Sequence, residues 1–276
     1  MTRSVRRTRR TPRTLRAVGA GAAALMTLSA CSSSGSSEAD SGTAGSGSSA
    51  KLSGTVTVFA AASLQESFTT LGKRFEKEHP GTKVTFSFGG SDTLAANITG
   101  GAPADVFAAA SAKTMAIVTA EQDAVGAPAT FVRNQLEIAT LPGNPDKVTS
   151  LKDLTKSGLK VVLCDKTVPC GSAAQTALES AGLELTPVSY EQDVKSALTK
   201  VELKEADAAV VYKTDVKAAG DKVAGVAFPE SAKAVNDYPI ALLKNAPNPA
   251  VAKAFIQLVQ SAEGQKVLTG AGFLTP

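Results

Sequence analysis

From residue 52 onward, short apolar runs of strand length alternate with stretches that have the apolar spacing of amphipathic helices. In the first part of the chain, each strand-like run is followed by a helical stretch: 55–60 then 64–79, 83–88 then 93–99, and 105–109 then 112–121. This alternation predicts an α/β fold with a mostly parallel sheet and helices on both faces. In such a sheet, ligands bind beyond the carboxyl ends of the strands.

A second set of elements begins at residue 135. Its strand-like runs are 135–140, 160–163, 188–190, 208–212 and 224–228, and its helical stretches are 151–156, 172–181 and 192–201. The pattern changes again near residue 237, to a strand at 239–243 and helices at 249–260 and 262–268. We therefore predict two lobes, each a mostly parallel sheet flanked by helices. Residues 52–133 and 237–276 form the first lobe, residues 134–236 form the second, and the two crossovers form a hinge.

The first 30 residues have the composition of an export signal. Seven of the 29 basic residues of the chain lie there, with no acidic residue, and an apolar run at 17–30 follows them. That run is too short to span a bilayer as a mature helix, so we predict that residues 1–30 are a signal peptide. The other 22 basic residues stand against 25 acidic ones. The net charge of +4 therefore belongs to the signal and does not indicate nucleic-acid binding.

The apolar run ends in Leu28-Ser29-Ala30-Cys31, which resembles a bacterial lipobox. This resemblance implies cleavage before Cys31, lipidation of its thiol, and attachment to the extracytoplasmic face of the cell membrane. The alternative is an ordinary signal in which Cys31 is incidental. Residues 32–50 are nearly all Ser, Gly and Ala with a few acids, so we expect residues 31–51 to be the lipidated cysteine and a flexible linker.

Two cysteines remain in the folded part, Cys164 and Cys170, on either side of a short loop at residues 165–169. In an exported protein, two such cysteines favour a disulfide over a metal pair. Free thiols stay an alternative, because the sequence does not give the separation of the Cα atoms.

The chain offers little for catalysis. His79 is its only histidine and ends a surface-patterned helix, so no Ser–His pair is available. No nucleophile elbow, P-loop, dinucleotide-binding glycine motif or zinc cluster occurs in the sequence. Acids such as Asp92 and Asp193 are the remaining acid–base candidates. Surface carboxylates are common, so their presence alone does not indicate catalysis. We predict a binding protein with no cofactor rather than an enzyme.

Four predicted helix starts carry small or polar residues. The strand at 55–60 leads through three alanines to Ser63, which we expect to be the N-cap of the next helix. The other three starts are Gly89-Gly90-Ser91-Asp92, Val168-Pro169-Cys170-Gly171 and Gln192-Asp193-Val194. A helix start presents unpaired N–H groups and a partial positive charge, which suit an anion. With Tyr212 at the end of a strand, these starts predict a cleft lined with neutral donors.

Several of these segments resemble the periplasmic molybdate-binding proteins of ABC importers, which are type II solute-binding proteins. The resemblance covers residues 52–276 and implies the two-lobed type II fold. It is carried by Thr57-Val58-Phe59-Ala60-Ala61-Ala62-Ser63-Leu64, Gly101-Ala102-Pro103-Ala104-Asp105-Val106-Phe107, Val168-Pro169-Cys170-Gly171, Asp193-Val194, Val210-Val211-Tyr212, Phe228-Pro229-Glu230 and Asp237-Tyr238-Pro239-Ile240.

The resemblance implies a site for a tetrahedral dianion, with molybdenum held only as molybdate. Ser63 and Ser91 would each give a hydroxyl and a backbone N–H, Cys170 and Val194 a backbone N–H only, and Tyr212 its phenol. Asp92 stands where many relatives have a small neutral residue. We expect its carboxylate to point outward and cap its helix.

The resulting hypothesis is a lipid-anchored, monomeric protein that captures molybdate, and tungstate as well, and delivers it to an ABC permease and its ATPase. The same class offers a binder of sulfate or thiosulfate as an alternative. A site made only of donors disfavours a protonated anion such as phosphate. From other classes, the alternatives are a surface serine hydrolase that uses Ser63 and a sensing lipoprotein.

Overall fold

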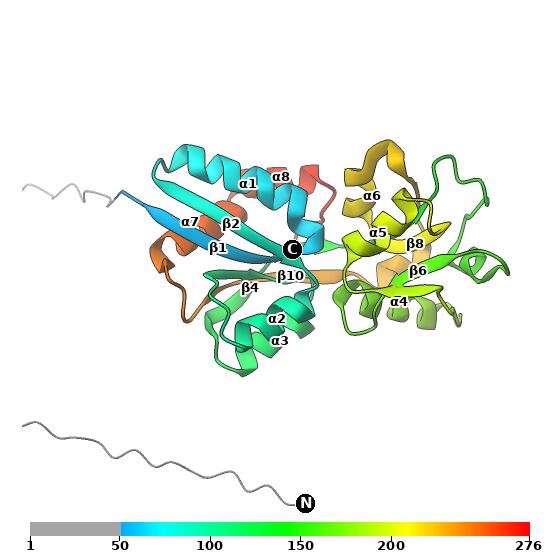
Figure 1. Cartoon of the computed structure of the whole chain (residues 1–276), viewed down its shortest axis with the longest axis horizontal. Helices are drawn as coiled ribbons and strands as arrows, with labels where there is room; N and C mark the ends of the chain where they lie inside the picture. The colour runs from blue at the N-terminus through cyan, green and yellow to red at the C-terminus, as the bar shows by residue number, and fades with distance from the viewer. Residues whose placement is uncertain (1–50) are drawn as a thin grey trace, which may run out of the picture. The chain divides into compact units, whose positions relative to one another are not determined.

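Two five-stranded sheets organise residues 51–276, which are the residues that this computed structural model describes. The signal peptide expected at 1–30 and the lipidation expected at Cys31 lie outside the described residues. Among the helices within 51–276, none has both the length and the apolar character needed to cross a bilayer. Figure 1 shows the two sheets in separate halves of this region, each with its own helices.

The first sheet has the strand order β2-β1-β3-β10-β4. Its strands are β1 (Gly54–Ala61), β2 (Thr82–Gly89), β3 (Val106–Ala108), β4 (Ala124–Asn134) and β10 (Asn236–Leu243). β1 pairs in parallel with β2 and β3, whereas β10 runs antiparallel to β3 and β4. Four strands therefore share one direction and β10 opposes them. Together with its helices, this sheet forms the first lobe.

Alternate residues of β10 pack against different helices. Ile240 and Leu242 lie in the core that includes the helices α1 and α7, whereas Ala241 and Leu243 lie in a second core with α2 and α3. The helices of this lobe are α1 (Gln65–Glu78), α2 (Ser91–Thr99), α3 (Ala112–Ala120), α7 (Pro249–Gln260) and α8 (Ala262–Gly270). The sheet is thus covered on both faces, which is why the strand pattern is apolar at successive positions.

The second sheet has the strand order β7-β6-β8-β5-β9. Its strands are β5 (Leu136–Thr140), β6 (Val161–Cys164), β7 (Ser189–Glu191), β8 (Ala208–Tyr212) and β9 (Ala224–Val226). β6 is parallel to β7 and β8, and β5 is antiparallel to β8 and β9. With α4 (Pro169–Ser180), α5 (Val194–Glu202) and α6 (Lys213–Ala219), it forms the second lobe.

The chain passes between the lobes twice, and the two passages lie side by side. β4 ends at Asn134 and β5 begins at Leu136, while β10 begins at Asn236, which pairs with Asn134 in the first sheet. Beside them, Arg133 Nε donates to Asp237 Oδ1 at 2.7 Å. Two adjacent extended segments suit a hinge, because small φ/ψ changes there move one lobe relative to the other.

Two elements have no counterpart in the sequence prediction. β4 is an edge strand that contains Pro128 and several exposed small residues, so it lacks the apolar pattern of a buried strand. α6 has seven residues and is too short for a clear helical repeat. The helix expected at 151–156 is a 3₁₀ turn, η2 (Leu151–Thr155). Two further 3₁₀ turns, η3 (Gly220–Lys222) and η4 (Pro229–Lys233), complete the second lobe.

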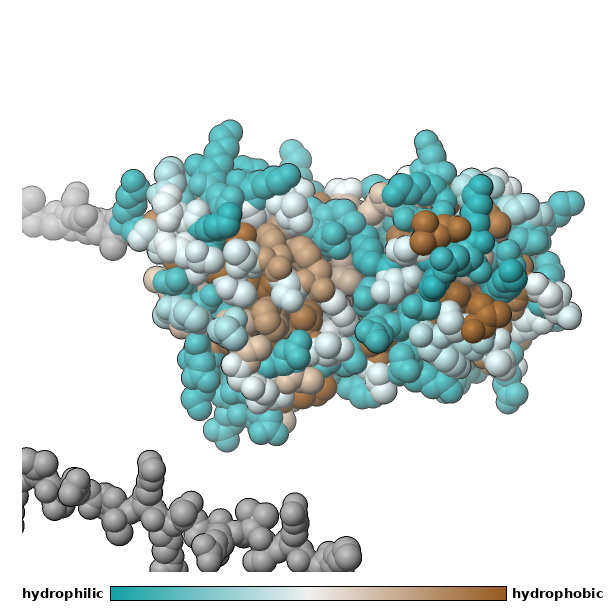
Figure 2. All heavy atoms as spheres, viewed as in Figure 1, coloured by the Kyte–Doolittle hydropathy of each residue, from teal (hydrophilic) through white to brown (hydrophobic). Residues whose placement is uncertain are grey.

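The surface follows from the amphipathic pattern of the helices. On the face shown in Figure 2, hydrophilic residues cover most of both lobes, and hydrophobic residues gather over the middle of the first lobe and in smaller patches on the second. In α1 the apolar side is buried through Phe68, Leu71 and Phe75. Phe68 and Phe75 contact Phe255 of α7 edge to face, with ring centroids 5.9 and 5.6 Å apart. Such aromatic pairs contribute about 0.5–1.5 kcal/mol each beyond the buried area.

Candidate functional site

A small cavity lies between the two lobes, where the carboxyl ends of the parallel strands meet. Its volume is about 20 Å³, and its wall has seven residues from the first lobe and six from the second. One water molecule needs roughly 10–15 Å³, so the cavity suits one compact ion and is far too small for an organic ligand of drug size. The structure brings all five predicted site residues into this wall: Ser63, Ser91, Cys170, Val194 and Tyr212.

Each of the five residues stands at or after the end of a parallel strand. Ser63 follows β1 and Ser91 follows β2 in the first lobe. In the second lobe Cys170 follows β6, Val194 follows β7, and Tyr212 is the last residue of β8. The strand directions alone therefore bring donors from both lobes to one place.

Ser63 is not the N-cap of the following helix, so that expectation was wrong. The strand β1 passes into a 3₁₀ turn, η1 (Ala62–Leu64), and the cap position of α1 falls on Leu64. Ser63 is 4% exposed, and its Oγ lies 2.8 Å from the phenol oxygen of Tyr238. Because its hydroxyl does not cap the helix, it remains available to the cavity.

Asp92 also differs from the expectation. Gly90 takes the cap position of α2, so Asp92 falls inside the first turn and does not cap the helix. Its Oδ1 is buried and has no hydrogen-bond partner within residues 51–276, so the carboxylate does not simply point outward. Asp92 does not line the cavity, whereas its neighbour Ser91 does.

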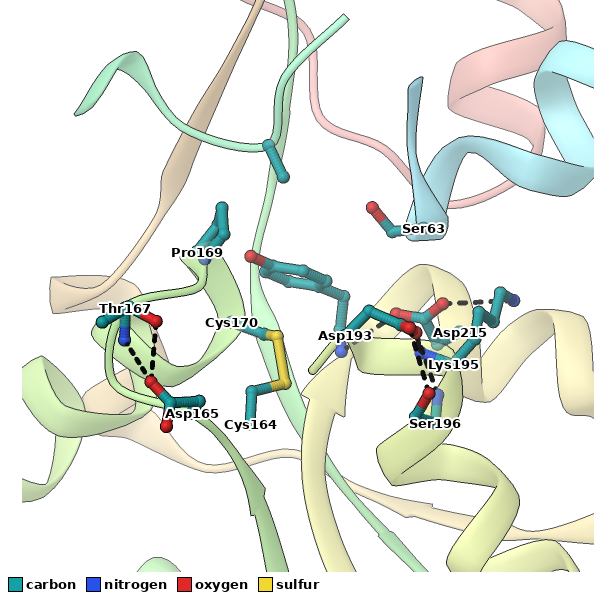
Figure 3. Close-up of a disulfide and its surroundings, with 12 residues drawn as sticks. Ser63, Cys164, Asp165, Thr167, Pro169, Cys170, Asp193, Lys195, Ser196 and Asp215 are labelled. Carbon is teal, nitrogen blue, oxygen red and sulfur yellow. Dashed lines mark hydrogen bonds and ion pairs between the residues drawn. A yellow bond between two sulfur atoms is a disulfide. The ribbon is translucent and has the colours of Figure 1, made fainter. Parts of the chain in front are cut away.

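The start of α4 is held by a disulfide. Cys164, the last residue of β6, bonds to Cys170 in the first turn of α4, with Cα atoms 5.8 Å apart (Figure 3). Pro169 occupies the first helical position and has no N–H, so the first free helical N–H belongs to Cys170. A Cβ on Gly171 would lie 1.9 Å from the Asp165 carbonyl oxygen, so the helix start packs directly on the loop backbone.

The start of α5 leaves one N–H for the cavity. Asp193 is the N-cap, and its Oδ1 accepts from the N–H groups of Lys195 and Ser196 at 2.8 and 3.0 Å (Figure 3). Its Oδ2 accepts from Ser196 Oγ at 3.0 Å. The carboxylate is therefore engaged with its own helix and not with the cavity. The N–H of Val194, the first helical residue, has no acceptor inside the helix.

Asp193 is the one charged residue among the described residues that line the cavity, and its carboxylate accepts hydrogen bonds from its own helix. No lysine or arginine is among the lining residues within 51–276. Lys195 Nζ contacts Glu66 Oε1 of the first lobe at 2.8 Å and Asp215 Oδ1 of the second at 3.2 Å. Burial raises the pKa of Asp215 to about 6, although the Lys195 ammonium lowers it. An anion in the cavity would be held by neutral donors.

Two buried tyrosines, one from each lobe, meet near the cavity. Tyr212 and Tyr238 are 1% and 0% exposed, and their ring centroids are 6.0 Å apart. Burial, and then the neighbouring phenol, raises the pKa of Tyr212 well above its usual value; burial likewise raises the pKa of Tyr238. Both phenols therefore keep their protons at neutral pH. Tyr212 was predicted from the sequence to lie in the site, whereas Tyr238 was not.

The geometry around Ser63 does not match a hydrolase. The partner of its hydroxyl is a phenol, whereas His79 lies beyond the far end of α1 and packs on Phe75 with ring centroids 4.6 Å apart. The 14 residues of α1 separate the two by about 21 Å. Within residues 51–276, no group of three or more His, Cys, Asp or Glu side chains is placed to hold a metal ion.

Two lobes joined by adjacent crossovers, with helix starts from both lobes around one small cavity, define a type II solute-binding protein. Residues 56–274 match the family of bacterial extracellular solute-binding proteins. The chain belongs to this family and is an extracytoplasmic binding protein, not an enzyme. The predicted fold and the predicted binding role are confirmed, and the serine-hydrolase alternative is excluded.

Individual relatives carry more specific names. The chain is 44% identical over 222 residues to the molybdate-binding protein ModA of Mycobacterium tuberculosis, covering 80% of this chain and 85% of the relative. It is 33% identical over 237 residues to the Escherichia coli protein of the same name, covering 80% and 89%. The periplasmic molybdate-binding protein of Azotobacter vinelandii superposes with a TM-score of 0.71 over 80% of this chain and 99% of that one. Because the two sequences are only 21% identical, this superposition shows the shared fold alone.

Proposed function

We propose that the cavity binds molybdate, and tungstate as well, and that the protein delivers the bound ion to an ABC permease and its ATPase. One observation supports this proposal: residues from four helix starts and one strand end, drawn from both lobes, line a cavity of about 20 Å³. The relatives that are 44% and 33% identical are molybdate-binding proteins, which supports molybdate as the ion.

The donors suffice energetically without a bound cation. Ser63 and Ser91 would each supply a hydroxyl and an N–H, Cys170 and Val194 an N–H, and Tyr212 its phenol. Hydrogen bonds to a charged group contribute about 1.5–3 kcal/mol each, so seven give roughly 10–20 kcal/mol before ordering and closure are counted. A Kd between about 1 μM and 1 nM requires only about 8–12 kcal/mol. The surplus covers the entropy lost on binding.

The rest of the chain fits capture at a membrane surface. We propose that residues 1–30 are removed as a signal peptide, that Cys31 carries a lipid, and that residues 31–51 tether a monomeric two-lobed domain. Residues 52–133 with 237–276 would form one moving lobe and residues 134–236 the other. Closure around the ion would present a joint surface of both lobes to the permease.

Equilibrium dialysis tests the ligand. The purified protein is dialysed separately against molybdate, tungstate, sulfate and phosphate, and bound molybdenum, tungsten, sulfur and phosphorus are measured. We expect one molybdate or one tungstate per chain and little sulfate or phosphate. Equal retention of sulfate would change the ion but keep the oxyanion site. Retention of none of the four would contradict the proposed function.

Substitution of the predicted anchor residue tests the location. Cys31→Ser removes the thiol that would be lipidated, so we expect the protein to leave the membrane fraction and appear in the medium. Molybdate binding by the released protein should be unchanged, because residues 51–276 contain the cavity. Retention of the variant in the membrane fraction would contradict lipid anchoring.

A further inference from the structure

Three of the cavity donors are hydroxyls, and a hydroxyl can either donate or accept a hydrogen bond. Ser63, Ser91 and Tyr212 therefore form a donor-only site only if something fixes the direction of each O–H bond. The groups behind them in the structure favour one direction, because each hydroxyl oxygen accepts, or is placed to accept, a hydrogen bond from behind.

The direction at Ser91 is set by the backbone. The N–H of Ala110, the second residue after β3, donates to Ser91 Oγ at 3.0 Å. An amide N–H can only donate, so Ser91 Oγ must accept. The hydroxyl proton of Ser91 is left free to turn into the cavity. Ser91 and Ala110 both line this cavity.

The direction at Tyr212 is set by Asn236 in the second crossover. Asn236 Nδ2 lies 2.8 Å from the carbonyl oxygen of Ala110, and a carbonyl can only accept, so this amide atom is the nitrogen. The same Nδ2 lies 2.8 Å from Tyr212 Oη. The phenol oxygen therefore accepts from Asn236, and its own proton is available for an anion. An anionic acceptor is preferred over a neutral one for this proton.

The direction at Ser63 is set by a relay from Asn134 in the first crossover. Asn134 Oδ1 accepts from the N–H of Gln135 at 3.0 Å, so its Nδ2 is the atom that faces Tyr238 Oη at 3.3 Å. Because the phenol oxygen accepts there, its proton is free to be donated to Ser63 Oγ, 2.8 Å away. Ser63 Oγ in turn accepts, and its proton is directed to the cavity.

We propose that Asn134, Tyr238 and Asn236 are positioning residues that fix the hydroxyl protons of Ser63 and Tyr212 toward the cavity. The hydroxyls of Ser63 and Tyr212 then present hydrogen atoms to the cavity, so it selects oxyanions that carry no proton over hydrogen-bearing ones such as hydrogen phosphate. This inference rests on the proposed function, and it assigns the origin of the selectivity to residues that do not contact the ion.

The test compares affinities for molybdate and for inorganic phosphate in the wild type and in Tyr238→Phe, by calorimetry at pH 7. The variant loses the donor behind Ser63, whose hydroxyl can then rotate and accept the proton of hydrogen phosphate. We expect molybdate affinity to fall about tenfold and phosphate affinity to rise or become measurable. Tyr190→Phe is the matched control, because Tyr190 is 46% exposed and does not line the cavity; it should change neither affinity.

A second variant protects the test against misfolding. Asn236→Ser removes the amide that orients Tyr212. As for Tyr238→Phe, we expect molybdate affinity to fall and phosphate affinity to rise. Thermal unfolding is recorded for every variant. Phosphate affinity that falls in step with molybdate affinity, or stays below detection, would show a merely structural role and overturn the inference while the proposed function stands. A wild-type protein that binds no oxyanion would overturn both.

Discussion

Ser63 and Ser91 are buried serines whose hydroxyls line the cavity. Replacement of either by alanine removes one hydrogen bond to the ion and keeps the backbone N–H. Because such a bond contributes about 1.5–3 kcal/mol, we expect molybdate affinity to fall at least about tenfold in each variant, measured by calorimetry. Ser67→Ala is the control, since Ser67 is equally buried but does not line the cavity. A loss no larger than that of the control would remove the hydroxyl from the site.

Asp215 gives the stability a pH dependence of predictable sign. Burial raises its pKa from 3.8 to about 6, although Lys195 opposes this shift. Between these two values the folded protein binds more protons than the unfolded chain. The contribution of Asp215 to stability is therefore fully present below pH 3.8 and is lost as the pH rises through about 6.

The variant Asp215→Asn isolates this contribution, because it lacks the titrating group. We expect the free energy of unfolding of the wild type, relative to that of the variant, to decrease between pH 4 and pH 7 in urea denaturation. A difference that does not change with pH would show that Asp215 ionises in the folded protein as it does in the unfolded chain.

For single residues, the sequence predicted those that line the cavity but not those that orient them. Ser63, Ser91, Cys170 and Val194 stand at local strand-to-helix junctions, and such junctions leave a local signal. Tyr238 is 175 residues from the serine it contacts. No local pattern encodes that contact.

At the scale of elements, the start of α4 is positioned by the disulfide from the end of β6. Cys164 and Cys170 are six residues apart, and closing a loop of that size stabilises the fold by about 2 kcal/mol. We expect the double variant Cys164→Ala, Cys170→Ala to unfold at a correspondingly lower urea concentration. Its molybdate affinity should fall by less than that of Ser63→Ala, because the backbone N–H of residue 170 remains.

A loss of affinity as large as in Ser63→Ala, in a double variant shown to be folded, would contradict a backbone role for residue 170.

The helices and strands were predictable from the sequence where the apolar repeat is long, as in α1 and α7. The edge strand β4 and the short helix α6 were not, because an edge strand needs no apolar face and seven residues show barely two helical turns.

At the scale of the whole domain, the two lobes approach closely at one glycine. A Cβ on Gly90 would lie 2.5 Å from the carbonyl oxygen of Gln192 in the other lobe. The Cβ would also lie 2.7 Å from Asp92 Oδ1, at the end of a side chain that can turn away, and the backbone of Gly90, with φ −61° and ψ 131°, accepts an alanine. Gly90→Ala should therefore leave the free energy of unfolding nearly unchanged while it keeps the lobes apart.

We expect Gly90→Ala to bind molybdate at least about tenfold more weakly, since the donors of the second lobe no longer reach the ion. Small-angle X-ray scattering with molybdate present should give a larger radius of gyration for the variant than for the wild type. Gly270→Ala is the control, because no atom lies within 4 Å of its added Cβ. Equal radii and equal affinities would show that Gly90 does not limit closure.

We expect closure to be driven by the ion and not by surface charge. The ion pair between Lys195 and Glu66 joins the lobes, but the Glu66 side chain is 50% exposed, so the pair contributes at most about 1 kcal/mol. The hydrogen bonds proposed for the ion contribute roughly ten times as much. The lobes should therefore close when the ion binds.

Titration calorimetry of the purified protein with molybdate, repeated with Ser63→Ala, shows whether neutral donors of the cavity bind the ion. We expect one molybdate per chain, a Kd at or below about 1 μM for the wild type, and a Kd at least about tenfold higher for the variant. A wild-type protein that releases no heat with molybdate, or a variant that binds it as tightly as the wild type, would contradict the claim that these neutral donors form an oxyanion site.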